Sequence, residues 1–175
     1  MREVELIVLD FIQQYLRTPI GDVVMTVITK LGNGGFCWIA TGISLLMSKK
    51  YRKVGIFVLA SLCIEILLCN VILKNVVGRI RPCDVSNTIQ LLIPRPKDYS
   101  FPSGHTAASF AAVTALYLGK VKRWYLALLL AVAIAFSRLY LYVHYPTDIL
   151  GGIIVGVISA VIAKYYIEKI NKRKK

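Results

Sequence analysis

Three basic side chains lie near the ends of apolar segments, where a membrane protein meets water. Lys74 and Arg81 are seven residues apart, so two helical turns would place both on one face of a helix that Pro82 ends. Arg138 lies at the end of another apolar segment, where its guanidinium can hold two phosphoryl oxygens at once. Lys74 and Arg81 form either an anion clamp or a pair that extends to the membrane surface, and this segment alone leaves both interpretations open.

A second segment, Pro102-Ser103-Gly104-His105, precedes an apolar helix. The first turn of a helix presents unpaired N–H groups, and here a serine hydroxyl lies beside them and a glycine allows an anion to approach the backbone. The segment therefore predicts a phosphate cradle with His105 in reach of the bound anion. An ordinary helix cap with a histidine at the interface is the competing interpretation.

The third segment contains a histidine and a carboxylate four residues apart. Pro146 suits the first position of a helix, so we expect His144 just outside the last apolar helix and Asp148 in its first turn. The carboxylate can then accept a hydrogen bond from one imidazole nitrogen and leave the other nitrogen unprotonated. A histidine held in this way can act as a nucleophile.

Together these segments resemble the signature motifs of a known family. The pattern is Lys74-(six residues)-Arg81-Pro82, Pro102-Ser103-Gly104-His105 and Ser137-Arg138-(five residues)-His144-(three residues)-Asp148. In order and spacing it is similar to the three motifs of the type 2 phosphatidic acid phosphatase family. The resemblance implies an integral-membrane hydrolase of phosphomonoesters or diphosphates that needs no metal and no other cofactor.

The resemblance also implies a role for each matching residue. His144 would be the nucleophile that forms a phosphohistidine, Asp148 would orient its ring, and His105 would be the general acid and later the base. The residues that would hold the phosphoryl oxygens are Lys74, Arg81, Ser103, Gly104 and Arg138.

The composition agrees with a membrane protein. Hydrophobic residues make up 57% and charged residues 18% of the 175 residues, and the mean hydropathy is +0.63. The net charge of +13 raises the possibility of nucleic-acid binding, but the basic residues lie between apolar segments rather than on one soluble face. We therefore expect membrane lipids as partners and no nucleic acid. The four cysteines are scattered and predict no disulfide framework.

Apolar stretches predict the elements that position the site. A bilayer core of about 30 Å takes roughly 20 helical residues. Five stretches approach that length, namely 35–47, 54–73, 105–118, 124–141 and 149–166, and 3–31 forms a sixth, interfacial or broken element split at Pro19. We expect one domain over residues 1–175, an all-α polytopic bundle of about six transmembrane helices.

Basic residues in short loops predict the orientation, because they accumulate on the cytoplasmic side. They gather in 49–53, in 120–123 and in a basic tail, 164–175. Both termini are then cytoplasmic, and the active site faces outward at the membrane–water boundary. With its compactness and composition, the chain is expected to be a bacterial enzyme of the cytoplasmic membrane.

The substrate remains open at this stage. The resemblance covers several lipid phosphates, of which we favour undecaprenyl diphosphate, with phosphatidylglycerol phosphate or a broad-specificity phosphatidic acid phosphatase as alternatives. A protein that binds phospholipid without catalysis and a vanadate-dependent haloperoxidase are more remote rivals. The loop 83–100 could form a lid or simply an apolar anchor.

Overall fold

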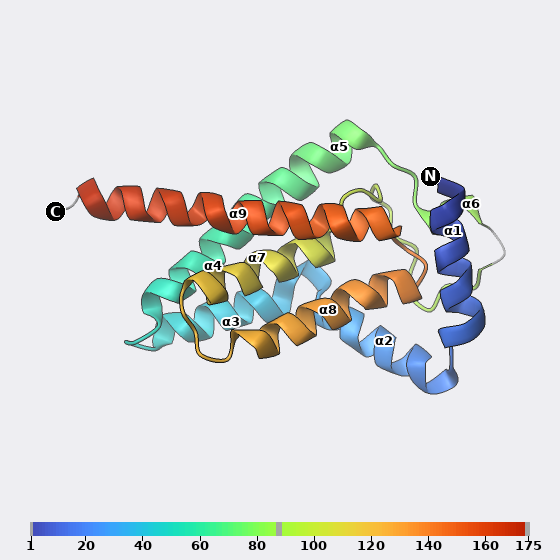
Figure 1. Ribbon diagram of the computed structural model, residues 1–175, viewed down its shortest axis with the longest axis horizontal. Helices are drawn as coiled ribbons and strands as arrows, with labels where there is room; N and C mark the ends of the chain where they lie inside the picture. The colour runs from blue at the N-terminus through green and yellow to red at the C-terminus, as the bar shows by residue number, and fades with distance from the viewer. Residues whose placement is uncertain (1, 87–88, 174–175) are drawn as a thin grey trace.

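The computed structural model describes residues 2–86 and 89–173, in which all regular elements are helical. In chain order these are α1 (Arg2–Phe11), η1 (Ile12–Leu16), α2 (Pro19–Leu31), η2 (Asn33–Gly35), α3 (Phe36–Met47), α4 (Arg52–Glu65), η3 (Ile66–Leu73), α5 (Lys74–Val77), α6 (Pro82–Val85), α7 (Gly104–Leu118), α8 (Trp124–Tyr140) and α9 (Pro146–Arg173). Two of the short elements, η1 and η3, are π-helical and η2 is a 3₁₀ turn. The predicted all-α bundle is confirmed (Figure 1).

Small residues bring α7 and α9 into close contact in the middle of the bundle. A Cβ atom at Gly152 would lie 2.7 Å from the carbonyl oxygen of Ser103, and one at Gly156 would fall on the carbonyl oxygen of Ala107. The two helices therefore pack backbone against backbone, which is the usual use of small residues between membrane helices. This contact fixes the start of α7 against the start of α9, and both starts carry predicted site residues.

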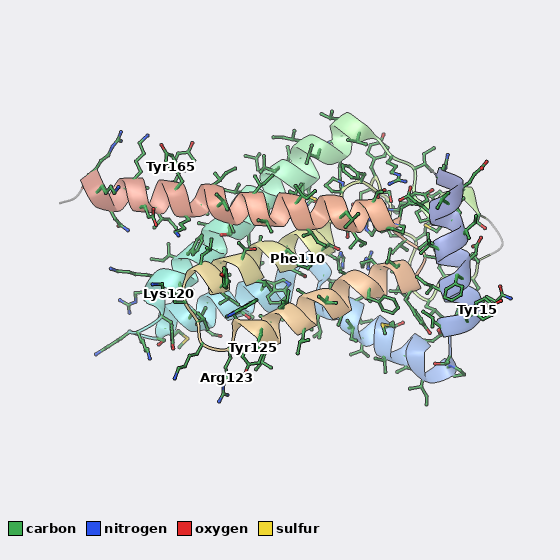
Figure 2. All side chains as sticks on the ribbon, in the orientation of Figure 1. Tyr15, Phe110, Lys120, Arg123, Tyr125 and Tyr165 are labelled. Carbon is green, nitrogen blue, oxygen red and sulfur yellow. The ribbon has the colours of Figure 1, made fainter. Side chains whose placement is uncertain are left out.

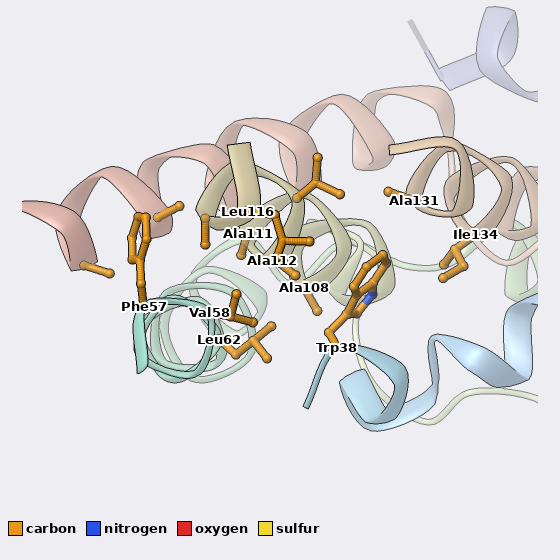
Figure 3. Close-up of a cluster of buried hydrophobic side chains, with 14 residues drawn as sticks. Trp38, Phe57, Val58, Leu62, Ala108, Ala111, Ala112, Leu116, Ala131 and Ile134 are labelled. Atoms are coloured by element: carbon orange, nitrogen blue, oxygen red, sulfur yellow. The ribbon is translucent and has the colours of Figure 1, made fainter. Parts of the chain in front are cut away.

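The largest hydrophobic core lies between α3, α4, α7, α8 and α9 (Figure 3). Its buried members include Trp38, Phe57, Leu62, Leu116 and Ile134. The indole Nε1 of Trp38 donates a 2.9 Å hydrogen bond to Ser109 Oγ of α7, which satisfies the buried polar atom of this side chain.

The expected number of six transmembrane helices is not confirmed. Within the described residues, two helical segments are long and apolar enough to cross a membrane: one begins at Arg52 and the other is α9. A third is possible if α2 and the helix from Asn33 to Met47, which meet at a 46° bend, count as one broken span. The predicted spans at 35–47, 105–118 and 124–141 are helical, but α3, α7 and α8 have only 12, 15 and 17 residues, fewer than a full bilayer core requires.

The N-terminal element is broken near Pro19, as predicted. Thr18 caps α2, because its side chain accepts a hydrogen bond from Gly21 N, and Pro19 occupies the first helical turn. The helix α1 lies across the end of the bundle where α8 ends and α9 begins (Figure 1). Asp10 accepts a 2.7 Å hydrogen bond from the Tyr142 hydroxyl, so α1 is attached to the chain segment that connects α8 with α9.

The opposite end of the bundle is basic. Lys120 and Arg123 lie at the turn between α7 and α8, far along the long axis from Tyr15 (Figure 2). The helix α9 continues to Arg173, so the described part of the predicted basic tail, 164–173, is helical rather than irregular.

Candidate active site

Six of the eight predicted site residues line one cavity of about 390 Å³: Lys74, Arg81, Gly104, His105, Arg138 and His144. They come from four separate parts of the chain, namely the beginning of α5, the segment before α6, the beginning of α7 and the end of α8 with the loop that follows it. The remaining two, Asp148 and Ser103, are fully buried and do not line this cavity.

Lys74 and Arg81 meet in a different way from the one predicted. The helix ends at Val77, because Gly78 adopts a left-handed conformation with φ of 59°. Arg81 follows in extended backbone and Pro82 begins α6 rather than ending the helix that contains Lys74. The expectation of a shared helix face is therefore wrong, and the chain reversal at Gly78 is the physical reason that both cations still reach one cavity.

The hydrogen bonds of His144 define its tautomer. An Arg81 Nη1–H lies 3.1 Å from His144 Nε2. A guanidinium only donates hydrogen bonds, so Nε2 must carry the free electron pair and the proton lies on Nδ1. His144 Nδ1 faces Asp148 Oδ2 at 3.5 Å, an electrostatic contact longer than a good hydrogen bond.

The surroundings of His144 keep its ring neutral. The side chain is 1% exposed. Burial lowers the pKa of His144 to about 3, Asp148 opposes this shift, and the nearby cations Arg81 and Arg138 add to it. At neutral pH the imidazole is therefore an unprotonated base with Nε2 as its electron-pair donor.

Asp148 is held by four groups in addition to its own backbone. Its Oδ2 accepts hydrogen bonds from Ser100 Oγ at 2.5 Å and from Tyr145 N at 2.8 Å. Its Oδ1 accepts a 2.6 Å hydrogen bond from Arg79 Nη1. Neither Ser100 nor Arg79 was found by the sequence analysis, since only the fold brings them to this carboxylate.

His105 is in contact with a loop that the sequence analysis treated only as a flexible break. Its Nε2 lies 2.9 Å from Asn33 Oδ1. An amide oxygen only accepts hydrogen bonds, so this geometry places a proton on Nε2 of His105. Asn33 belongs to η2 and also lines the cavity.

Arg138 presents an unused donor. Its Nη1 donates to Thr29 Oγ1 of α2 at 2.5 Å, while its Nε has no hydrogen-bond partner among the described residues. A buried guanidinium N–H without a partner is costly. In a cavity-lining side chain it can be satisfied by an oxygen of a bound phosphoryl group.

Ser103 and Gly104 begin α7 as the sequence predicts. Ser103 caps the helix, accepting hydrogen bonds from Thr106 N at 3.5 Å and from Thr106 Oγ1 at 3.0 Å. Gly104 lines the cavity, so the first turn of the helix adjoins it. Ser103 thus acts structurally as the cap, while the cavity wall is formed by Gly104.

Asp98 occupies the position between two of the cations. Its carboxylate pairs with Lys74, and its Oδ1 accepts a 2.8 Å ion-paired hydrogen bond from Arg81 Nη2. Burial alone would raise the pKa of Asp98, but the ion pairs with Lys74 and Arg81 lower it to about 2. The Asp98 side chain is still 52% exposed, so an incoming anion can compete with it for both cations.

A second cavity of about 310 Å³ shares four lining residues with the first: Lys74, Asp98, Gly104 and His105. Its other walls are contributed by η2, α3 and the long helix that begins at Arg52, and they include Ile39, Leu62 and Ile66. His144 does not line it. The second cavity therefore lies beside His105 and extends toward apolar helix surfaces.

The loop 83–100 forms one wall of the first cavity through Ile93, Pro94, Arg95 and Pro96. Ile89, Leu91, Leu92 and Ile93 pack against the buried cluster that contains Leu9, Tyr140 and Tyr142. The described part of this loop is thus anchored by apolar contacts while its later residues border the cavity.

The donor set of the site is basic rather than metal-binding. Across 2–86 and 89–173, no group of three or more His, Cys, Asp and Glu side chains is placed to hold a metal ion. All four cysteines are free thiols.

Two curated relatives are similar over most of this chain. An undecaprenyl-diphosphatase of Sulfolobus acidocaldarius is 38% identical over 133 residues, covering 75% of this chain and 64% of the relative, so the chain spans less than two thirds of that protein's length. The phosphatidylglycerophosphatase B of Bacillus subtilis is 33% identical over 173 residues, covering 90% of this chain and 80% of the relative.

Solved structures show the same fold. Aquifex aeolicus LpxE superposes with a TM-score of 0.78 at 29% identity, covering 92% of this chain and 94% of that one. A transmembrane PAP2-type phosphatidylglycerolphosphate phosphatase from Bacillus subtilis gives a TM-score of 0.76 at 28% identity, with 97% and 87% covered. These relatives and the apolar helices support an integral membrane protein. The PAP2 superfamily model matches residues 54–172, and the chain belongs to this superfamily.

Proposed function

We propose that this protein is a membrane phosphatase that hydrolyses a phosphomonoester or diphosphate at the end of a lipid. The observation that carries the proposal is the tautomer of His144. Its Nε2 electron pair lies in a cavity lined by Lys74, Arg81 and Arg138, so a nucleophile and the cations that bind its target share one space.

In the first step, His144 Nε2 attacks phosphorus while the bond from phosphorus to the leaving oxygen breaks. The leaving oxygen takes a proton from His105, and the product is a phosphohistidine. The negative charge that spreads over the three remaining oxygens is stabilised by Lys74, Arg81, Arg138 and the N–H groups at the start of α7. Asp148 stabilises the positive charge that develops on the His144 ring.

In the second step, His105 accepts a proton from water, whose oxygen attacks the phosphohistidine. The phosphorus–nitrogen bond breaks, inorganic phosphate leaves and His144 becomes neutral again. Water is the only co-reactant that the two steps require, and the overall products are the dephosphorylated lipid and phosphate.

The two cavities support an arrangement for the lipid. In-line displacement puts the leaving group on the side of phosphorus opposite the nucleophile. The second cavity borders His105 but not His144, and it leads toward apolar residues of α3 and α4. The leaving part of the substrate therefore occupies the second cavity while its phosphoryl group occupies the first.

Among lipid substrates we place undecaprenyl diphosphate first, supported by the name of the Sulfolobus relative. Phosphatidylglycerol phosphate is the second candidate, supported by the names of the two Bacillus subtilis proteins. A broad-specificity enzyme that also accepts phosphatidic acid is the third.

The proposed location is the cytoplasmic membrane of a bacterium, with the cavity facing outward and both termini in the cytoplasm. The basic residues gathered at the end of the bundle opposite α1 support this orientation. A cysteine introduced at Lys172, in a variant whose exposed Cys63 is replaced by serine, should react with a membrane-impermeant maleimide only after cells are opened.

The function is tested by phosphate release from the three lipids in detergent, with excess chelator and no divalent metal. We expect release that survives chelation, and the order of kcat/KM values ranks the substrates. A purified, folded protein that binds these lipids without releasing phosphate would favour the binding-protein alternative. Halide oxidation by the vanadate-loaded protein would favour the haloperoxidase alternative.

A further inference from the structure

Asp148 is connected to the N-terminal helix by a second arginine. Arg79 Nη1 donates to Asp148 Oδ1 at 2.6 Å, and Arg79 Nη2 donates to Glu5 Oε2 of α1 at 2.5 Å. One guanidinium thus bridges two carboxylates, one from the proposed catalytic pair and the other from a helix with no predicted site residue. We propose that Arg79 and Glu5 are positioning residues that fix Asp148 behind His144, which makes α1 a part of the catalytic apparatus.

The location of Arg79 excludes direct contact with the phosphoryl group as its main role. Arg79 does not line either of the two cavities around His105, and its guanidinium stacks over the Tyr145 ring at 3.9 Å. The stacking and the two ion pairs fix the plane of the guanidinium. Arg79 therefore acts on the reaction through Asp148, in contrast to Arg81, which reaches His144 directly.

Glu5 completes the bridge from α1. Its Oε1 accepts hydrogen bonds from Thr147 N at 3.0 Å and from Thr147 Oγ1 at 2.5 Å. Thr147 Oγ1 also accepts a 2.7 Å hydrogen bond from Arg79 Nη1. The Glu5 carboxylate is thereby fixed to the residue that directly precedes Asp148, although 143 positions separate Glu5 from Asp148 in the sequence.

The need for such a bridge follows from the burial of Asp148. This side chain is fully buried, and the distance of 3.5 Å between His144 Nδ1 and Asp148 Oδ2 leaves the pair sensitive to small displacements. When His144 forms a bond to phosphorus, its ring becomes positively charged and must contact an ionised, correctly placed carboxylate. A fixed cation on Oδ1 and fixed donors on Oδ2 keep the carboxylate ionised and oriented.

The test compares kcat and KM of full-length Arg79→Gln, Arg79→Lys and Glu5→Gln with those of the wild type. Because the phosphate-binding cations remain in place, we expect Arg79→Gln to lower kcat about 10- to 100-fold while KM stays within about twofold of the wild type. Arg79→Lys should recover part of kcat, since it keeps the charge but loses one of the two bridging contacts. Glu5→Gln should lower kcat less than Arg79→Gln, and combining the two changes should cost less than the product of the single effects.

Matched controls are available in the same N-terminal region. Arg17 pairs with Asp22 at 3.2 Å, so Arg17→Gln removes an equivalent arginine–carboxylate pair that does not reach Asp148. Glu3 is an exposed carboxylate on the same helix as Glu5. Arg17→Gln and Glu3→Gln should both retain the wild-type kcat.

The inference rests on the proposed hydrolysis, and the outcomes separate the two. Wild-type protein without turnover would overturn the proposed function and the inference with it. Wild-type turnover with an unchanged kcat in folded Arg79→Gln would overturn the inference alone, as would a raised KM with an unchanged kcat, which would make Arg79 a substrate-binding residue. If Arg79→Gln does not fold, an unchanged kcat in both Arg79→Lys and Glu5→Gln contradicts the inference.

Discussion

At the level of single residues, His144 and Asp98 show how one cavity holds a neutral base and strong cations together. Arg81 contacts both side chains, donating to His144 Nε2 and to the Asp98 carboxylate. In the absence of substrate, Asp98 neutralises part of the positive charge on Lys74 and Arg81. A phosphoryl group carries more charge than a carboxylate, so it can take over these contacts and bring its phosphorus close to Nε2.

The low pKa of His144 sets an expectation for the pH profile. The nucleophile must be unprotonated and His105 must be protonated, so kcat/KM should be bell-shaped. Because the pKa of His144 is lowered to about 3, loss of its neutral form occurs only below about pH 5. The fall on the alkaline side then reports His105. A fall in kcat/KM centred at the ordinary histidine pKa of 6.5 on the acid side would contradict this assignment.

Asp98→Asn should strengthen anion binding. The change removes a negative charge that competes for Lys74 and Arg81 while the amide keeps a similar shape. We expect inhibition constants for inorganic phosphate and orthovanadate to fall about 3- to 10-fold, measured in competition with a lipid substrate. Asp84→Asn is a suitable control, since Asp84 pairs with Arg95 instead. Higher inhibition constants in Asp98→Asn would mean that this carboxylate orients the cations rather than competing for them.

At the level of elements, the packing of α7 on α9 determines whether the site assembles. The start of α7 carries Gly104 and His105, and the start of α9 carries Asp148. Ser103 N also donates a 3.0 Å hydrogen bond to Asp148 O, which joins the two helix starts directly. The separation of these helices therefore controls the distance between the proposed acid and the proposed nucleophile.

Gly156→Leu should destabilise the protein and reduce its activity together. A side chain at this position would collide with Ala107 O and Ala111 N of α7. Overpacking of this kind costs about 1–3 kcal/mol, which lowers the melting temperature measured in detergent. Ile154→Leu is the control, because Ile154 is 58% exposed on the same helix. An unchanged melting temperature for Gly156→Leu would show that α7 and α9 can separate freely.

The sequence predicts the elements better than the contacts between them. Apolar stretches, the cap at Ser103 and Pro146 at a helix start locate α7, α8 and α9 within a few residues. Hydropathy does not predict that Gly78 ends the helix four residues after Lys74, because a single left-handed residue leaves no periodic signal. Partners such as Asn33 and Glu5 are far from the motifs in the sequence, so only the tertiary packing brings them to the site.

At the level of the whole molecule, the site lies where separate parts of an integral membrane protein meet. The loop after the helix that begins at Arg52, the start of α7, the end of α8 and the start of α9 all contribute to it. The helix α1 lies across this end (Figure 1), and the basic residues Lys120 and Arg123 lie toward the other end (Figure 2). This polarity fits a substrate whose apolar part stays among helices while its phosphate enters a cavity at the bundle's end.

The central claim is that His144 forms a covalent bond to phosphorus, and trapping that species tests it most directly. Full-length protein is mixed with lipid substrate labelled with ³²P at the phosphorus under attack, quenched in alkaline detergent within the first turnover and digested for mass spectrometry. We predict label on the peptide that contains His144, labile to acid and absent from His144→Ala. Phosphate release by the wild type with no labelled peptide, or turnover retained by His144→Ala, would contradict the account.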